Sequence, residues 1–101
     1  MARYEEILDD FNRVVVVVRF ETEGREVTDY AVILLVKVAG CRRTVRVYDG
    51  AHGYNELHRY TRDGGKQTGK RFHSGSLGEG MRAAIDDVKS GYQKMIEGWE
   101  R

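Results

Sequence analysis

The sequence predicts an α+β fold: a short N-terminal helix, an antiparallel three- to four-stranded sheet, and a long amphipathic C-terminal helix packed on the sheet. Two observations predict it. Alternating and β-branched apolar residues fill the first half of the chain, as in strands. An apolar stripe with spacings of three and four fills the last quarter, as in a helix. At 101 residues and 41% hydrophobic, the chain suits one core, so residues 1–101 are expected to form a single domain.

The N-terminal helix is expected from four apolar residues at helical spacing: Tyr4, Ile7, Leu8 and Phe11. A strand is expected next, because residues 14–18 are five consecutive valines. β-branched side chains favour extended backbone. The Glu-Gly-Arg sequence at residues 23–25 then predicts a turn.

The second expected strand covers residues 28–38, and its centre from Tyr30 to Val36 is apolar on both faces. Such a strand usually lies in the middle of a sheet and is covered on both sides, or is covered by a partner chain. Ala39 and Gly40 predict a tight turn into a third strand at residues 42–49. A shorter fourth strand is expected at residues 56–62, followed by a glycine-interrupted loop at residues 63–75.

The C-terminal helix has a clear predicted start, because Ser76 and Glu79 stand at capping-box spacing. Its stripe consists of Met81, Ile85, Val88, Tyr92, Met95 and Trp99. We expect this stripe to close the core of the protein. The alternative is that it docks a second copy, which would make the protein a homodimer.

The net charge of +1 hides an uneven distribution. Residues 42–75 carry eight Lys and Arg against three Asp and Glu, whereas residues 1–41 carry five against eight. The basic segment can attract RNA or an acidic protein, or it can pair with the acidic N-terminal third. Cys41 is the single cysteine, which fits a reducing compartment. The apolar runs are far shorter than the ~20 residues of a membrane helix. We therefore expect a soluble cytoplasmic protein without a membrane partner.

Residues 48–60 carry the main chemical lead, with one Asp, one Glu, two His and three Tyr. Asp49, His52 and His58 offer metal-ligand atoms, but their spacing matches no standard zinc pattern. We therefore expect no metal and no cofactor.

Metal-free RNA cleavage needs a base, an acid and cations for the phosphate. His52 and His58 can act as base and acid, and Arg46 and Arg59 can hold phosphate. Bases can stack on Tyr48, Tyr54 and Tyr60. The alternative is purely structural: the two tyrosines are cross-strand neighbours, His58 is a polar rim residue, and His52 belongs to a turn.

Three short stretches resemble the TumE-type toxins of bacterial and archaeal toxin–antitoxin pairs: Val-Arg-Val-Tyr-Asp at 45–49, Ala-His-Gly at 51–53 and His-Arg-Tyr at 58–60. An aromatic residue (Phe72) and the amphipathic helix follow, so the resemblance covers roughly half of the chain, from about Val32 to the end of the helix. It implies an RNA-directed toxin neutralised by an antitoxin protein. The positions that it marks are Asp49, His52, His58 and Arg59.

The sequence therefore predicts a small toxin-like protein acting on RNA through this loop. Asp49, His52 and His58 are the predicted catalytic residues, and Arg46, Tyr48, Arg59 and Tyr60 the predicted substrate-binding residues. Whether the protein is an enzyme stays open; if it is, a metal-independent ribonuclease is expected. The alternative is a non-catalytic protein-binding module or homodimeric adaptor.

Overall fold

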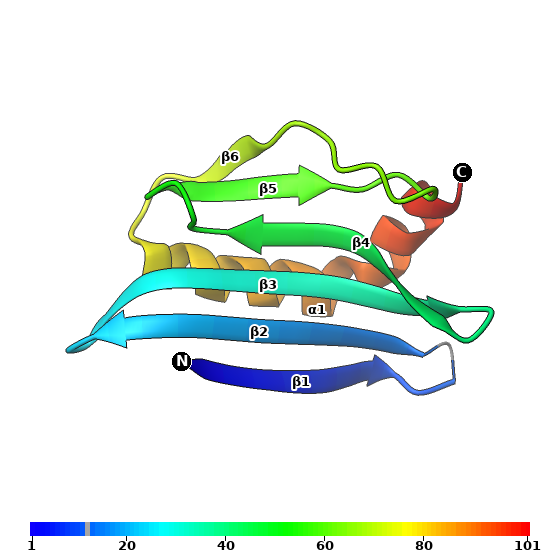
Figure 1. Ribbon diagram of the computed structural model, residues 1–101, viewed down its shortest axis with the longest axis horizontal. Coiled ribbons are helices and arrows are strands. Elements are labelled where there is room, and N and C mark those ends of the chain that lie inside the picture. Colours follow the sequence, from blue (N-terminus) through cyan, green and yellow to red (C-terminus); the bar gives the residue numbers. More distant parts are fainter. Residues whose placement is uncertain (12) are drawn as a thin grey trace.

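The computed structural model describes residues 1–11 and 13–101, which form a six-stranded antiparallel sheet and one long helix (Figure 1). The elements are β1 (Ala2–Asp9), β2 (Val14–Glu23), β3 (Glu26–Val38), β4 (Cys41–Asp49), β5 (Asn55–Arg59), β6 (Lys70–His73) and α1 (Leu77–Glu100). The strands lie in the sheet in the order of the sequence, so each pairs with the strand before it. The expected α+β class is confirmed.

The expected N-terminal helix is wrong, because Ala2–Asp9 form the edge strand β1. In the pairing with β2, Tyr4 lies opposite Val18 and Ile7 opposite Val15. Two physical reasons favour the strand. A helix this short is marginal in water, whereas β2 offers a row of backbone hydrogen-bonding groups that need partners. The helical spacing of the apolar residues was therefore outweighed by pairing with a distant segment.

β3 lies in the middle of the sheet, as expected, with β2 on one side and β4 on the other. The expected cover on both faces is not seen among the described residues, because α1 lies on one face only. The tight turn before β4 is confirmed by the positive φ angles of Ala39 (51°) and Gly40 (83°), which suit a two-residue hairpin. The register of β3 and β4 shifts between Leu34 and Leu35. This irregularity lets Val45 and Tyr48 both reach the core, where each is almost fully buried.

The second half of the sheet differs from the prediction in two ways. The fourth expected strand is shorter, since β5 ends at Arg59. The expected loop at residues 63–75 contains β6, a four-residue strand at the second edge of the sheet. The sequence of β6, Lys-Arg-Phe-His, has no apolar alternation that would indicate a strand. Its extended conformation depends on pairing with β5.

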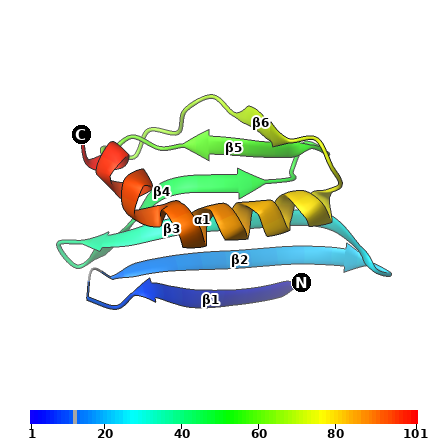
Figure 2. The same cartoon turned by 180° about the vertical axis from the view of Figure 1, so that it is seen from behind.

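The C-terminal helix is confirmed, and its predicted cap is present: the backbone N–H of Glu79 donates to Ser76 Oγ at 3.2 Å. Figure 2 shows α1 lying across one face of the sheet. Ala84, Val88 and Trp99 are buried against that face, together with the helix-facing valines of β2. The apolar stripe thus packs on the protein's own sheet. No helix in the described part of the chain is long and apolar enough to cross a membrane.

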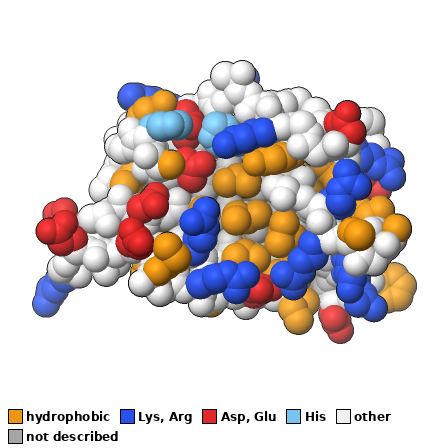
Figure 3. Space-filling model, viewed as in Figure 1, with side chains coloured by type: hydrophobic (Ala, Val, Ile, Leu, Met, Phe, Trp, Pro, Cys, Tyr) orange, Lys and Arg blue, Asp and Glu red, His pale blue; other side chains and the backbone are white. Residues whose placement is uncertain are grey.

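The other face of the sheet, which we call the open face, is not covered by the helix (Figures 1 and 3). The strand registers place an aliphatic strip on it: Val15, Val17, Ile33, Leu35 and Val47. The same registers put basic residues around this strip: Arg3, Arg19, Lys37 and Arg42. Figure 3 shows the strip as an apolar patch flanked by Lys and Arg.

Candidate functional site

The candidate site lies on the open face, where β4 and β5 meet the turn between them. Asp49 of β4 lies opposite Glu56 of β5, and His58 follows two residues later on the same face. Ligand atoms of these three side chains all lie within 4.8 Å of one another. We call Asp49, Glu56 and His58 the carboxylate–histidine cluster. Figure 3 shows histidines beside acidic residues at this end of the sheet.

His58 is held at both ring nitrogens. Its Nδ1 lies 3.2 Å from the carbonyl oxygen of Gln67, and its Nε2 lies 2.8 Å from Glu56 Oε1. Both of these partners accept hydrogen bonds, so the ring satisfies them when each nitrogen carries a proton. Asp49 Oδ2, 3.8 Å from Nε2, adds a second nearby negative charge. The side chain is only 10% exposed. His58 is thus a bonded member of the framework and not a free acid or base.

Glu56 is the centre of the hydrogen-bond network. Its carboxylate accepts from His58 Nε2, from the Tyr54 hydroxyl at 3.0 Å and from His52 Nδ1 at 3.2 Å. Burial alone would raise the pKa of Glu56, but these three hydrogen bonds together hold that pKa below its ordinary value. The same contact raises the pKa of Tyr54, because ionising its hydroxyl would remove the bond to the carboxylate. Glu56 therefore acts as an ionised acceptor.

His52 differs from His58 in one decisive way: its side chain is 66% exposed. It lies in the turn between β4 and β5, where Ala51 N–H donates to Asp49 Oδ1 and Gly53 has a φ of 83°. When Nδ1 donates to Glu56, Nε2 keeps its lone pair. A carboxylate that fixes the tautomer of an exposed imidazole is the arrangement of an acid–base dyad. His52 is therefore the histidine able to exchange a proton with a ligand.

Tyr54 and Arg71 complete this end of the site. The guanidinium carbon of Arg71 lies 4.2 Å from the centroid of the Tyr54 ring, a cation–π contact. The centroids of the His52 and Tyr54 rings are 6.1 Å apart. Arg71 reaches this position because β6 places it opposite Glu56. The imidazole of His52 and the guanidinium of Arg71 thus both lie beside the ring of Tyr54.

The backbone of Gly69 packs directly against the side chains of Glu56 and His58. A Cβ on this residue would lie 2.5 Å from both Glu56 Cδ and His58 Cε1, much closer than an ordinary contact. Only a residue without a side chain lets the backbone pass here. Gln67 N–H donates to the Arg59 carbonyl at 2.8 Å, which holds the same segment against β5. The loop expected at residues 63–75 is therefore packed on the candidate site.

The predicted substrate-binding residues do not gather at this cluster. Tyr48 is fully buried in the core, edge-on to Phe72 at 4.9 Å between centroids. Arg46 donates to the Tyr48 hydroxyl and lies opposite Arg59, on the helix side of the sheet. Tyr60 alone shares the open face, where it lines a hollow of about 300 Å³ beside Asp49. Arg19 and Lys66 also line that hollow.

The carboxylate–histidine cluster is also the group of described residues whose atoms could hold a metal ion. An imidazole with two carboxylates suits zinc, manganese or iron. The His58–Gln67 bond resembles the outer contact that orients a metal-bound histidine. A proton between His58 and Glu56 satisfies the same atoms. The geometry therefore fits both a metal-bound and a metal-free cluster.

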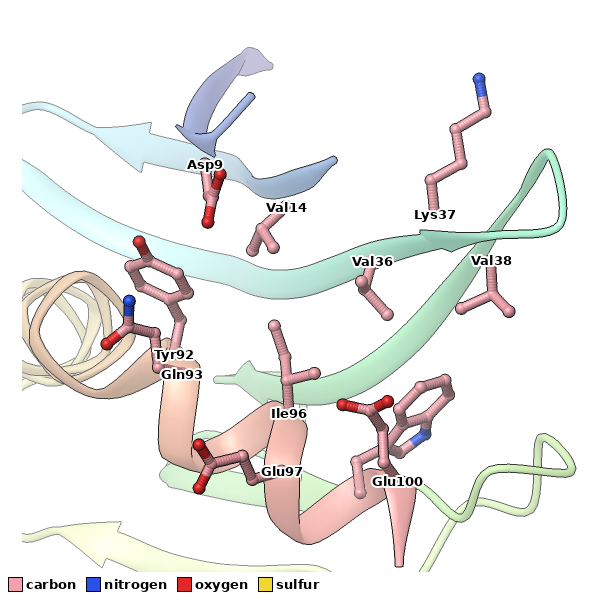
Figure 4. A pocket seen from close by; sticks show the side chains of 11 residues that line it. Asp9, Val14, Val36, Lys37, Val38, Tyr92, Gln93, Ile96, Glu97 and Glu100 are labelled. Carbon is pink, nitrogen blue, oxygen red and sulfur yellow. The ribbon is translucent and has the colours of Figure 1, made fainter. Parts of the chain in front are cut away.

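A larger hollow lies away from these residues. It has a volume of about 590 Å³ and lies between the last turns of α1 and the neighbouring parts of β1, β2 and β3 (Figure 4). Its floor is aliphatic, with Val14, Val36 and Ile96, and Glu97 and Glu100 lie at its edge. No residue predicted to carry chemistry lines it.

Two residues of the site were not selected from the sequence: Glu56 and Arg71. Glu56 could have been found, because Tyr54, Glu56 and His58 alternate and a strand places all three on one face. Arg71 could not, because its position depends on the pairing of β6 with β5.

Comparison with known proteins gives a family but no activity. No curated protein and no solved structure matches the chain. A family model described as "Domain of unknown function (DUF7718)" matches residues 1–101. The resemblance to TumE-type toxins stays a prediction, because this family's description assigns no toxin activity. Since the match spans the whole chain, the protein belongs to the DUF7718 family.

Proposed function

We propose that the protein is a toxin-like RNA-cleaving enzyme, with His52 as its general base. The observation that carries this proposal is the His52–Glu56 pair. Its 3.2 Å contact orients an imidazole that is still 66% exposed. His58, by contrast, has a partner at both ring nitrogens and is only 10% exposed. An oriented and exposed imidazole is poised to take a proton from a ligand.

The proposed reaction is an internal transesterification that needs no added reactant. His52 Nε2 takes the proton of the 2′-hydroxyl, and the 2′-oxygen then bonds to the adjacent phosphorus. The bond from phosphorus to the 5′-oxygen breaks, and that oxygen takes a proton from solvent. The products are a 2′,3′-cyclic phosphate and a free 5′-hydroxyl. Protonated His52 is stabilised by ionised Glu56, which favours the first proton transfer.

Substrate binding follows from the cations on the same face. Arg71 lies over Tyr54 and can stabilise the charge that develops on phosphate. Arg19, Tyr60 and Lys66 line the hollow beside Asp49, where a base can stack and its phosphate can be paired. Arg46 and Tyr48, on the helix side, are left out of this substrate path.

The direct test is cleavage of a labelled RNA oligonucleotide by the purified protein in the presence of EDTA. We expect fragments with 2′,3′-cyclic phosphate ends and no cleavage when a 2′-deoxynucleotide replaces the target position. His52→Ala should lower the rate by about 10²–10⁴-fold, the usual contribution of a general base. His73→Ala is the matched control, because His73 lies outside the Glu56 network. Equal rates for wild type and His52→Ala would refute the proposal.

The toxin part of the proposal is tested in a bacterial host. Induction of the wild-type chain should arrest growth, and His52→Ala should relieve the arrest while the protein level stays the same. An antitoxin that neutralises the protein should cover His52 and protect it from modification by diethyl pyrocarbonate. Arrest that persists in His52→Ala would exclude this site as the cause.

The second candidate function is a non-catalytic binding module or homodimeric adaptor. It is favoured by the aliphatic strip on the open face and the basic residues around it. The matching partner is a protein segment with aliphatic side chains flanked by acidic ones. This function predicts that His52→Ala keeps any growth phenotype, whereas Ile33→Asp, in the middle of the strip, removes it.

A further inference from the structure

The first strand carries an unusual concentration of exposed apolar side chains. The exposed large hydrophobic residues are Met1 (80%), Tyr4 (44%), Ile7 (64%) and Phe11 (93%). All four lie in the first eleven residues, in or beside β1. β1 is an edge strand that pairs with β2 on one side only, within the described residues. Its eight residues include no proline and no lysine, which protect many edge strands, although four of them are charged: Arg3, Glu5, Glu6 and Asp9.

We propose that the free edge of β1 pairs antiparallel with β1 of a second copy, with Tyr4 opposite Tyr4. Two identical strands in one continuous sheet are related by a two-fold axis perpendicular to the sheet. Such an axis lies midway between the two copies of one residue of β1, because facing residues must lie on the same face of the sheet. The choice of that central residue fixes every other pair.

Charge excludes the neighbouring registers. Centring on Arg3 puts two arginines opposite each other, and centring on Glu5 or Glu6 does the same with two glutamates. Centring on Ile7 places Glu5 opposite the second copy's Asp9, again two like charges. Centring on Tyr4 leaves no like-charge pair.

The Tyr4 register also pairs the exposed apolar side chains. Arg3 then lies opposite the second copy's Glu5, and Met1 opposite its Ile7, both on the open face. The two Tyr4 rings meet on the helix side. Three of the four exposed hydrophobic residues are thereby paired by one register. Glu5 already contacts Arg3 at 3.0 Å and Arg42 at 2.8 Å, and the second copy's Arg3 would add a third cation beside it.

The second edge of the sheet offers no equivalent. β6 has four residues, of which Lys70 and Arg71 are cationic, so two copies of this edge would repel each other. The proposed dimer is a sheet of twelve strands with both helices on the same side. Because three strands separate β1 from β5, the carboxylate–histidine clusters remain accessible. The inference is therefore independent of the proposed function.

The test is the mass of the full chain by light scattering, at concentrations from about 5 to about 500 µM, because an interface of one strand is small. We expect a mass approaching twice 11.6 kDa as concentration rises. Tyr4→Lys should give a monomer, since it puts two ammonium groups opposite each other. Phe11→Lys is the control: Phe11 is also exposed but lies outside the paired segment, so this variant should still dimerise. A monomeric wild type would overturn the proposal.

A cysteine pair tests the register itself in a Cys41→Ser background. Tyr4→Cys places two cysteines directly opposite, about 4.5–5.5 Å apart between Cα atoms, within reach of a disulfide. Ile7→Cys places them six positions apart, about 20 Å, which is too far. We expect oxidised dimer from Tyr4→Cys alone. Cross-linking through Ile7→Cys, or a dimer that survives Tyr4→Lys, would show that another surface holds the copies together.

Discussion

Gly69→Ala offers a sharp test of the packing around the candidate site. The new Cβ would lie 2.5 Å from Glu56 Cδ and from His58 Cε1, where ordinary contacts begin near 3.4 Å. The backbone of Gly69 or the two side chains must therefore move by nearly 1 Å. Overpacking of this kind costs about 1–3 kcal/mol. We expect the free energy of unfolding to fall by that amount, which lowers Tm by about 4–8 °C per kcal/mol in a domain of this size.

The assay is urea denaturation followed by circular dichroism, with Gly98→Ala as control. Gly98 lies in α1, where an added Cβ would meet nothing within 4 Å, so alanine there should not destabilise the protein. The cost of Gly69→Ala should also shrink when Glu56 and His58 are both alanine, because the clashing atoms are then absent. If Gly69→Ala is as stable as wild type, or if its cost is unchanged in that background, the described packing of Gly69 on the cluster is wrong.

Four further predictions use the same structure. His58→Ala should lower the free energy of unfolding by about 1–3 kcal/mol, because it leaves buried acceptors unpaired. His52→Ala removes an exposed side chain and should change the same free energy by less than about 0.5 kcal/mol. Equal losses in urea denaturation would contradict a structural role for His58 and an exposed, non-structural role for His52. The pKa of Glu56 is lower in the folded state than its ordinary 4.5, so its contribution is present above that pH and is lost as pH falls through the folded pKa. Glu56→Gln should therefore flatten the loss of stability below about pH 4.5, and an unchanged acid profile would argue against the network. Tyr30→Phe removes the 2.8 Å hydrogen bond to the buried Asn55 and should cost about 1 kcal/mol by calorimetry; no loss would mean that water replaces the hydroxyl. Millimolar Mn²⁺ or Zn²⁺ should leave Tm unchanged if a proton joins His58 to Glu56, and a rise that disappears in His58→Ala would instead make the cluster a metal site.

Elements with a strong local signal could be predicted from the sequence. The five valines defined β2, and Ser76 with the apolar stripe defined α1. The two errors concern segments whose structure depends on distant partners. β1 has helical spacing but pairs with β2, and β6 has almost no pattern but pairs with β5. Local propensity is a weak guide where the other half of each hydrogen bond lies elsewhere in the chain.

The candidate site was predictable in its chemistry and not in its roles. Asp49, His52 and His58 were selected, and the structure brings all three to one end of the open face. The spacing of these residues in the sequence could not show that the Gln67 carbonyl contacts the ring of His58. It also could not show that the side chain of His52 stays exposed. Arg46 and Tyr48 looked equally suitable, but the irregular register of β4 turns them toward the helix.

The hydrogen bonds also connect the exposed histidine to the loop before β6. The backbone carbonyl of Gln67 lies 3.2 Å from His58 Nδ1, His58 Nε2 lies 2.8 Å from Glu56 Oε1, and the same oxygen lies 3.2 Å from His52 Nδ1. If the loop leaves its place, His58 loses one partner and Glu56 is freer to turn, which loosens the orientation of His52. A ligand that displaces the loop would therefore weaken the acid–base pair, whereas one that binds over the docked loop would keep it. The backbone carbonyl of Gln67 thus supports the orientation of His52 indirectly, through His58 and Glu56.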